Sequence, residues 1–122
     1  MNTFDMNILK ELGSLTREIR KEVSSMIGTG VDIKSLIDFI EKKIFETGNF
    51  PSFPAMVSVN DMAAHYTVYN EGYILQKGDV IKVDFGISRN GFITDNAFTV
   101  EVDSNEHEEL LTCAKACLDA AM

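Results

Sequence analysis

The stretch that decides the fold is DVIKVDFGISRNGFITDNAFTVEV, residues 79–102, in which two β-forming runs flank one Asn-Gly dipeptide. Asn90-Gly91 suits the two-residue type I′ turn, because both central residues of that turn have positive φ. The runs 79–88 and 92–102 are therefore predicted to pair as an antiparallel hairpin. This hairpin is the strongest local feature of the sequence, and the rest of the chain is expected to pack around it.

A two-residue turn determines which residues lie opposite each other across the hairpin. Asp84 is then opposite Ala97 and Asp95 opposite Gly86, so the two aspartates are diagonal neighbours on one face, with α-carbons on the order of 7 Å apart. Asp is disfavoured inside strands, and the small residues beside both acids are expected to leave room for a ligand. Converging carboxylates can bind one or two hard cations, whereas most Asp residues are solvated surface charges. Two carboxylates supply only part of a dinuclear site.

The other face of the hairpin is apolar and requires a covering layer. Its members are Ile81, Val83, Phe85, Ile87, Phe92, Phe98 and Val100. Two upstream segments carry apolar residues at spacings of three and four, which is typical of amphipathic helices. The first is expected over residues 5–27, and the second begins after Asp32, a suitable N-cap, and ends at Gly48. With a short strand over residues 56–60, the pattern predicts an α/β (α+β) fold in which an antiparallel sheet packs against amphipathic helices.

A third amphipathic helix is predicted after the hairpin, opened by Ser104 or Asn105 as its N-cap and followed by glutamates in its first turn. No stop signal interrupts its apolar pattern, so the chain is expected to end inside this helix at Met122. The helix carries the only cysteines, Cys113 and Cys117. Two residues build neither a disulfide framework nor a zinc set, so both are interpreted as reduced packing residues.

Composition sets the class of protein. The chain has 122 residues, which fits one domain over residues 1–122, and 45% hydrophobic with 25% charged residues is ordinary for a globular protein. The formal net charge of −8 argues against nucleic acid or an anionic membrane as a partner. No apolar run approaches the roughly 20 residues that span a bilayer, and the first residues lack a signal-peptide core. A cytoplasmic location is expected.

The two histidines have different settings. His65 follows the expected strand at a loop, where catalytic groups tend to lie, although a lone histidine is more often structural. His107 lies among glutamates at the start of the third helix and is expected to be a solvated surface residue.

Several motifs together resemble a known family. They are the dipeptide 53–54 (FP), the segments 57–60 (VSVN) and 63–67 (AAHYT), and the hairpin segments 78–86 (GDVIKVDFG) and 91–100 (GFITDNAFTV). In this order they resemble type 2 methionine aminopeptidases, including the spacing between the two hairpin aspartates. The resemblance covers nearly the whole chain and rests on three linked motifs.

The resemblance implies the amino-terminal half of a pita-bread fold, in which two similar halves surround two divalent metal ions, of Mn, Co, Fe or Zn. In that family, the enzyme removes the initiator methionine from proteins or peptides. The resemblance implies that Asp84 chelates one metal and Asp95 bridges both. It also implies that His65 is a catalytic and substrate-binding residue that hydrogen-bonds near the scissile amide, and that Phe53 lines the methionine pocket.

Two departures from the family pattern bear on activity. A histidine and two glutamates complete the metal sphere in the family, and all three belong to the carboxyl-terminal half, which this sequence does not contain. Val68 also stands where the family usually has Pro after the His-Tyr-Thr run. The lone chain is therefore expected to be inactive, because its own two carboxylates do not complete the metal sites.

Three interpretations remain open at this point. The leading one is one half of a two-half enzyme, paired with a complementary carboxyl-terminal chain across a large apolar interface. The second is a homodimer that presents Asp84 and Asp95 twice around one cavity. The third is a non-catalytic module that keeps the fold for binding a peptide or a protein, because fold alone does not imply activity.

Overall fold

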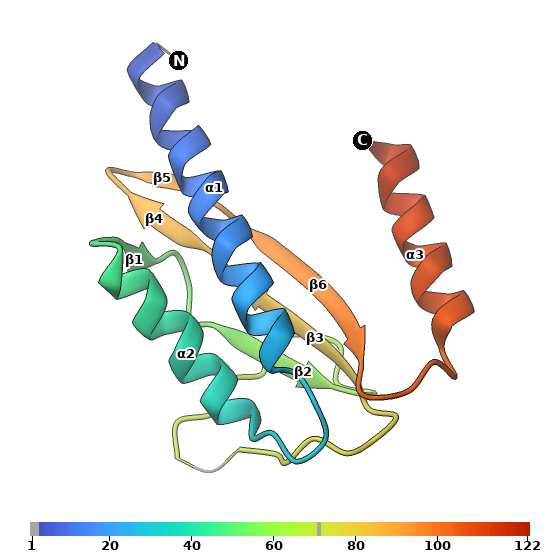
Figure 1. The fold of residues 1–122 in the computed structure, drawn as a ribbon. Coiled ribbons are helices and arrows are strands. Elements are labelled where there is room, and N and C mark those ends of the chain that lie inside the picture. The colour runs from blue at the N-terminus through green and yellow to red at the C-terminus, as the bar shows by residue number, and fades with distance from the viewer. Residues whose placement is uncertain (1–2, 71) are drawn as a thin grey trace.

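The computed structural model describes residues 3–70 and 72–122, and it has the mixed α/β architecture expected from the sequence (Figure 1). The elements in chain order are α1 (Thr3–Met26), α2 (Ile33–Glu46), β1 (Phe50–Pro51), β2 (Met56–Val59), β3 (Val80–Phe85), β4 (Ile87–Arg89), β5 (Phe92–Ile93), β6 (Asn96–Glu101) and α3 (Glu108–Ala121). Among the described residues, no helix is long and apolar enough to cross a membrane.

The central hairpin forms as predicted. Its turn residues Asn90 and Gly91 have φ values of 52° and 83°, the positive pair that a type I′ turn requires. The register also agrees, since Asp84 pairs with Ala97 in the antiparallel ladder between β3 and β6. The hairpin runs through two three-stranded antiparallel sheets, of order β2-β3-β6 and β1-β4-β5, and bends where one sheet passes into the other.

Helices α1 and α2 pack on one face of these sheets, and the apolar side of the hairpin lies beneath them (Figure 1). The buried core combines that side with the inward stripes of both helices, as the periodicity predicts. Asp32 caps α2 by accepting a hydrogen bond from the Lys34 N–H at 2.9 Å, which confirms the predicted start. The buried residues of α1 are Ile8, Leu12, Thr16, Ile19 and Val23, so one polar side chain interrupts its inward stripe.

Helix α3 begins later than predicted, and its cap is different. Its N-cap is His107, whose side chain makes no capping hydrogen bond. The N–H groups of Glu106 and His107, just before the helix, instead donate to the carboxylate of Glu101, each at 2.9 Å. The predicted opening at Ser104 or Asn105 is therefore wrong, because a carboxylate at the end of β6 supplies the acceptors that a cap residue would otherwise provide.

Helix α3 also stands away from the rest of the fold, beside the end of β6 (Figure 1). None of its residues is buried. Cys113 and Cys117 are free and exposed, so their interpretation as packing residues is wrong for this chain. The apolar stripe is present in the sequence of α3, but no other described element covers it.

Candidate metal centre

The hairpin brings the two predicted metal ligands to one place. Asp84 lies in the middle of β3, and Asp95 lies in the short connection between β5 and β6. Burial raises the pKa of the Asp84 carboxyl, and the negative charge of Asp95 raises that pKa further. The register places them on one face, because Asp84 pairs with Ala97 and Asp95 lies two residues before Ala97.

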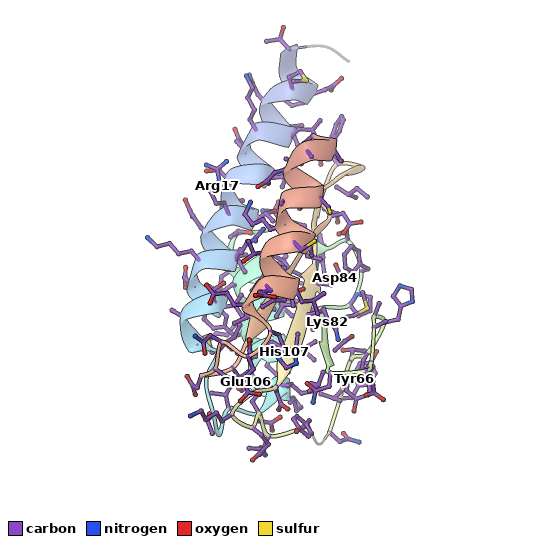
Figure 2. All side chains as sticks on the ribbon, turned by 90° about the vertical axis from the view of Figure 1, so that its right-hand side faces the viewer. Arg17, Tyr66, Lys82, Asp84, Glu106 and His107 are labelled. Atoms are coloured by element: carbon purple, nitrogen blue, oxygen red, sulfur yellow. The ribbon has the colours of Figure 1, made fainter. Side chains whose placement is uncertain are left out.

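The environment of Asp84 fits a cation. Its oxygen Oδ1 is buried and has no hydrogen-bond partner among the described residues. Lys82, two residues earlier on the same face of β3, donates its ammonium to the Asn60 carbonyl oxygen at 2.6 Å. Figure 2 shows Asp84, Lys82 and Tyr66 along the same side of the molecule. Asp84 is half-buried beside a second carboxylate and makes no Lys or Arg ion pair within residues 3–70 and 72–122, an arrangement that a divalent cation would stabilise.

His65 lies in the loop after β2, at the same face. This loop folds back on the sheet, where the Val57 N–H donates to the Tyr66 carbonyl oxygen at 3.0 Å. His65 has a φ of 61°, in the left-handed region that non-glycine residues seldom adopt, and its side chain is exposed. The His65 imidazole lowers the pKa of Asp84, opposing burial and Asp95. The structure therefore brings His65 within electrostatic reach of Asp84.

Phe53 lies against the bend of the hairpin. A β-carbon added at Gly86 would lie 2.0 Å from the Thr94 carbonyl oxygen, 2.2 Å from Ser52 Oγ and 3.1 Å from a ring carbon of Phe53. Gly86 is thus required because backbone and side chains approach it closely. The expectation that its small size leaves room for a ligand is wrong, since Ser52 and Thr94 fill that space.

The site is incomplete in the part of the chain that the structure describes. No group of three or more His, Cys, Asp or Glu residues there is placed to hold a metal ion. Asp84 and Asp95 can supply carboxylate oxygens, but a divalent ion needs four or more ligands. His107 adds none, because its ring pairs with Glu101 at 3.3 Å at the start of α3.

Sequence reasoning missed the residues that hold the bend. Ser52 Oγ donates to the Thr94 carbonyl oxygen at 3.1 Å, and Thr94 Oγ contacts Thr16 Oγ of α1 at 2.8 Å. The only signal in the sequence was the position of Thr16, four residues after Leu12 on the inward stripe of α1. A polar residue at such a position has to find a partner in the layer beneath it.

The comparison with protein families assigns the chain to a class of protein, the metallopeptidases, whose chemistry uses divalent metal ions. Residues 7–122 match metallopeptidase family M24, and the chain belongs to that family.

Curated relatives support the resemblance found in the sequence. The chain is 38% identical to a methionine aminopeptidase of Thermococcus onnurineus over 115 residues, which are 93% of the chain and 39% of that protein. It is 38% identical to the enzyme of that name from Pyrococcus horikoshii over 119 residues, 97% of the chain and 40% of that protein. The chain thus spans about 40% of the length of these relatives, which agrees with half of a two-half enzyme.

Solved structures support the fold. An X-Pro aminopeptidase of Thermotoga maritima matches with a TM-score of 0.71 and 19% identity, over 89% of the chain and 32% of that protein. Proline aminopeptidase P II of Yersinia pestis matches with a TM-score of 0.75 and 19% identity, over 84% and 24%. These similarities confirm the expected half of a pita-bread fold.

Proposed function

We propose that this chain forms one half of a metal-dependent aminopeptidase that removes N-terminal methionine from proteins or peptides. In this proposal, residues 1–122 act as one domain, the amino-terminal half, and a complementary carboxyl-terminal half supplies the remaining ligands. The names of the curated relatives support the substrate. We place the reaction in the cytoplasm, where the sequence is expected to reside.

The observation that carries the proposal is the unpaired carboxylate oxygen of Asp84. Its buried oxygen has no partner among the described residues, and the neighbouring Asp95 adds a second negative charge. Leaving a buried carboxylate oxygen unpaired is costly, so a fold that keeps it needs a cation from elsewhere. We assign Asp84 and Asp95 as ligands of two divalent ions, of Mn, Co, Fe or Zn.

The metal ions and the protein residues have separate tasks. Divalent ions in such a site polarise the substrate carbonyl and lower the pKa of a water molecule. His65, exposed on its loop beside the carboxylates, is assigned to the scissile amide of the peptide substrate, and Phe53 to the apolar pocket for the methionine side chain. The hairpin contributes rigidity, because Asp84 lies on a strand paired in a fixed register and Asp95 directly precedes the partner strand β6.

Reconstitution tests the proposal. The chain is mixed with a carboxyl-terminal half bearing the histidine and two glutamates it lacks, and methionine release from a short peptide with a small second residue is followed with Mn²⁺ or Co²⁺. We expect turnover from the mixture and almost none from the chain alone, because two carboxylates cannot hold two metal ions at useful affinity.

Matched variants localise the activity. Asp84→Asn and Asp95→Asn should each weaken metal binding and abolish turnover, whereas Glu106→Gln removes a charge remote from the site and should change neither. His65→Ala should lower kcat while metal binding persists, and Phe53→Ala should raise KM. Equal effects of the three acidic substitutions would indicate bulk charge instead of a site. Ordinary turnover by the chain alone would favour the homodimer, and a mixture that neither binds metal nor turns over would favour the binding module.

A further inference from the structure

The carbonyl group of Thr94, just before Asp95, does not take part in the regular hydrogen bonds of the hairpin ladder. The Thr94 N–H donates to the Ile87 carbonyl oxygen at 2.8 Å, as in a regular antiparallel pair. The return bond is different, because the Ile87 N–H donates to Thr94 Oγ at 3.0 Å instead of the Thr94 carbonyl oxygen. That carbonyl oxygen accepts from Ser52 Oγ. The side chain of Thr94 thus replaces the backbone just before Asp95.

The hydroxyl of Thr94 is held in turn by α1. Thr16 Oγ donates its single hydrogen to the Leu12 carbonyl oxygen at 2.8 Å. In the 2.8 Å contact between the two threonine hydroxyls, Thr94 must therefore be the donor. The hydrogen bonds run in one direction, from the Ile87 N–H through Thr94 and Thr16 to Leu12, and every hydrogen in them is used. Thr16 is 6% exposed, so its side of this contact is shielded from water.

A second residue of α1 holds the other neighbour of Asp95. Arg20 Nη1 donates to Asn96 Oδ1 at 3.0 Å, and the Arg20 guanidinium lies 4.8 Å from the centre of the Phe98 ring. Thr16 and Arg20 are four residues apart, so they lie one above the other on the same face of the helix. They reach Thr94 and Asn96, the residues on either side of Asp95.

We propose that Thr16 and Arg20 are positioning residues that hold Asp95 in the orientation in which its carboxylate meets that of Asp84 on a shared cation. The proposal rests on the assignment of Asp84 and Asp95 as metal ligands. Neither α1 residue touches the metal or the substrate. They act through hydrogen bonds to the neighbours of a metal ligand and so orient that ligand. Loss of such bonds weakens metal binding even though every ligand remains.

Mn²⁺ binding to the full chain tests this role without any measurement of turnover. Mn²⁺ is titrated into the nitrogen-15-labelled chain, and its paramagnetic broadening of the amide signals around Asp84 and Asp95 gives the dissociation constant. Thr16→Val, which keeps the shape and removes the hydroxyl, should weaken binding about ten-fold. Thr16→Ser should restore it. Arg20→Gln should weaken binding about three-fold, because its hydrogen bond to Asn96 is exposed.

Two control variants separate positioning from helix stability. Ser24 Oγ donates to the Arg20 carbonyl oxygen at 2.7 Å, the same local bond that Thr16 makes, but Ser24 is exposed whereas Thr16 is buried. Ser24→Ala should leave Mn²⁺ affinity unchanged. Arg17 is an exposed arginine of the same helix and lies well apart from Asp84 in Figure 2, so Arg17→Gln controls for the lost charge. Wild-type affinity in Thr16→Val, whatever its stability, would overturn the proposal.

Hydrogen exchange of backbone amides in metal-free protein distinguishes failure of the positioning proposal from failure of the metal assignment. Thr16→Val should speed exchange of the Ile87 amide, because the acceptor Thr94 Oγ is no longer held. Unchanged exchange together with unchanged Mn²⁺ affinity would mean that α1 does not hold the bend. Faster exchange, together with no localised Mn²⁺ broadening in the wild-type chain even when it is mixed with the complementary carboxyl-terminal half, would overturn the metal assignment itself and leave only a structural contact.

Discussion

Helices α1 and α3 have similar sequence patterns, but they differ in burial. Both are amphipathic, but α1 buries five residues against the sheets and α3 buries none. The difference lies in what faces each stripe: α1 crosses the apolar side of the hairpin, and α3 stands beside the end of β6 (Figure 1). Periodicity therefore identifies the face that a helix can bury, but it does not say whether the same chain supplies the covering surface.

The largest expected effect comes from matched leucine truncations. Leu12 of α1 is fully buried and Leu118 of α3 is 58% exposed. Leu12→Ala should lower the free energy of unfolding by about 3 kcal/mol, because it leaves a cavity under α1. Leu118→Ala should change it by less than about 0.5 kcal/mol. Urea unfolding followed by circular dichroism measures both, and equal losses would show that α3 is covered in solution, for instance by a second copy.

A pH titration should affect the two helices differently. Burial alone would raise the pKa of the Glu101 carboxyl, but hydrogen bonds from His107, Ser104 and Glu106 lower it overall. The stabilisation of the α3 start is therefore fully present above the ordinary pKa of 4.5 and is lost as the pH falls through the lowered value in the folded protein.

Amide exchange at Glu106 and His107 should accelerate in acid before exchange in α1 does, since the buried contacts of α1 contain no such carboxylate. In Glu101→Gln, the acceleration should already be present at neutral pH. Protection at both amides that persists in the variant would contradict this account of the α3 start.

The smallest effect compares ion pairs. Glu11 of α1 pairs with Arg89 of β4 at 2.6 Å, whereas Asp119 pairs with Lys115 within α3 at 2.8 Å. Glu11→Gln should cost up to about 1 kcal/mol because its partner is anchored by Asn49, and Asp119→Asn should cost about 0.3 kcal/mol. Thermal unfolding at low and high salt measures both. A larger loss for Asp119→Asn would contradict the view of α3 as a solvated helix.

Much of the fold could be predicted because its signals are local. Asn90-Gly91 determines the hairpin register, and Asp32 marks the start of α2. The register alone then places Asp84 and Asp95 on one face. Strand β1 was not predicted, because two residues carry no periodicity, and it depends on pairing with β4.

The parts of the site that escaped prediction depend on contacts between distant segments. Ser52 is 42 residues from Thr94, and Thr16 is 78 residues from it. Their hydroxyl bonds follow from how α1 and the loop before β2 pack on the bend. The start of α3 was missed for a different reason, since its acceptor is the side chain of Glu101, which is close in sequence but lies at the end of a strand and outside any capping motif.

The turn at Asn90-Gly91 also has a consequence for the chain entropy of the site. Asp84 and Asp95 are joined through a short loop, whereas Thr16 and Thr94 are 78 residues apart. Loop-closure entropy grows with the logarithm of length, so bringing the threonines together costs about 2 kcal/mol more than bringing the aspartates together. The proximity of the two carboxylates is thus encoded within one hairpin. The positioning of Asp95 that we propose for α1 requires, in addition, that α1 has packed on the hairpin.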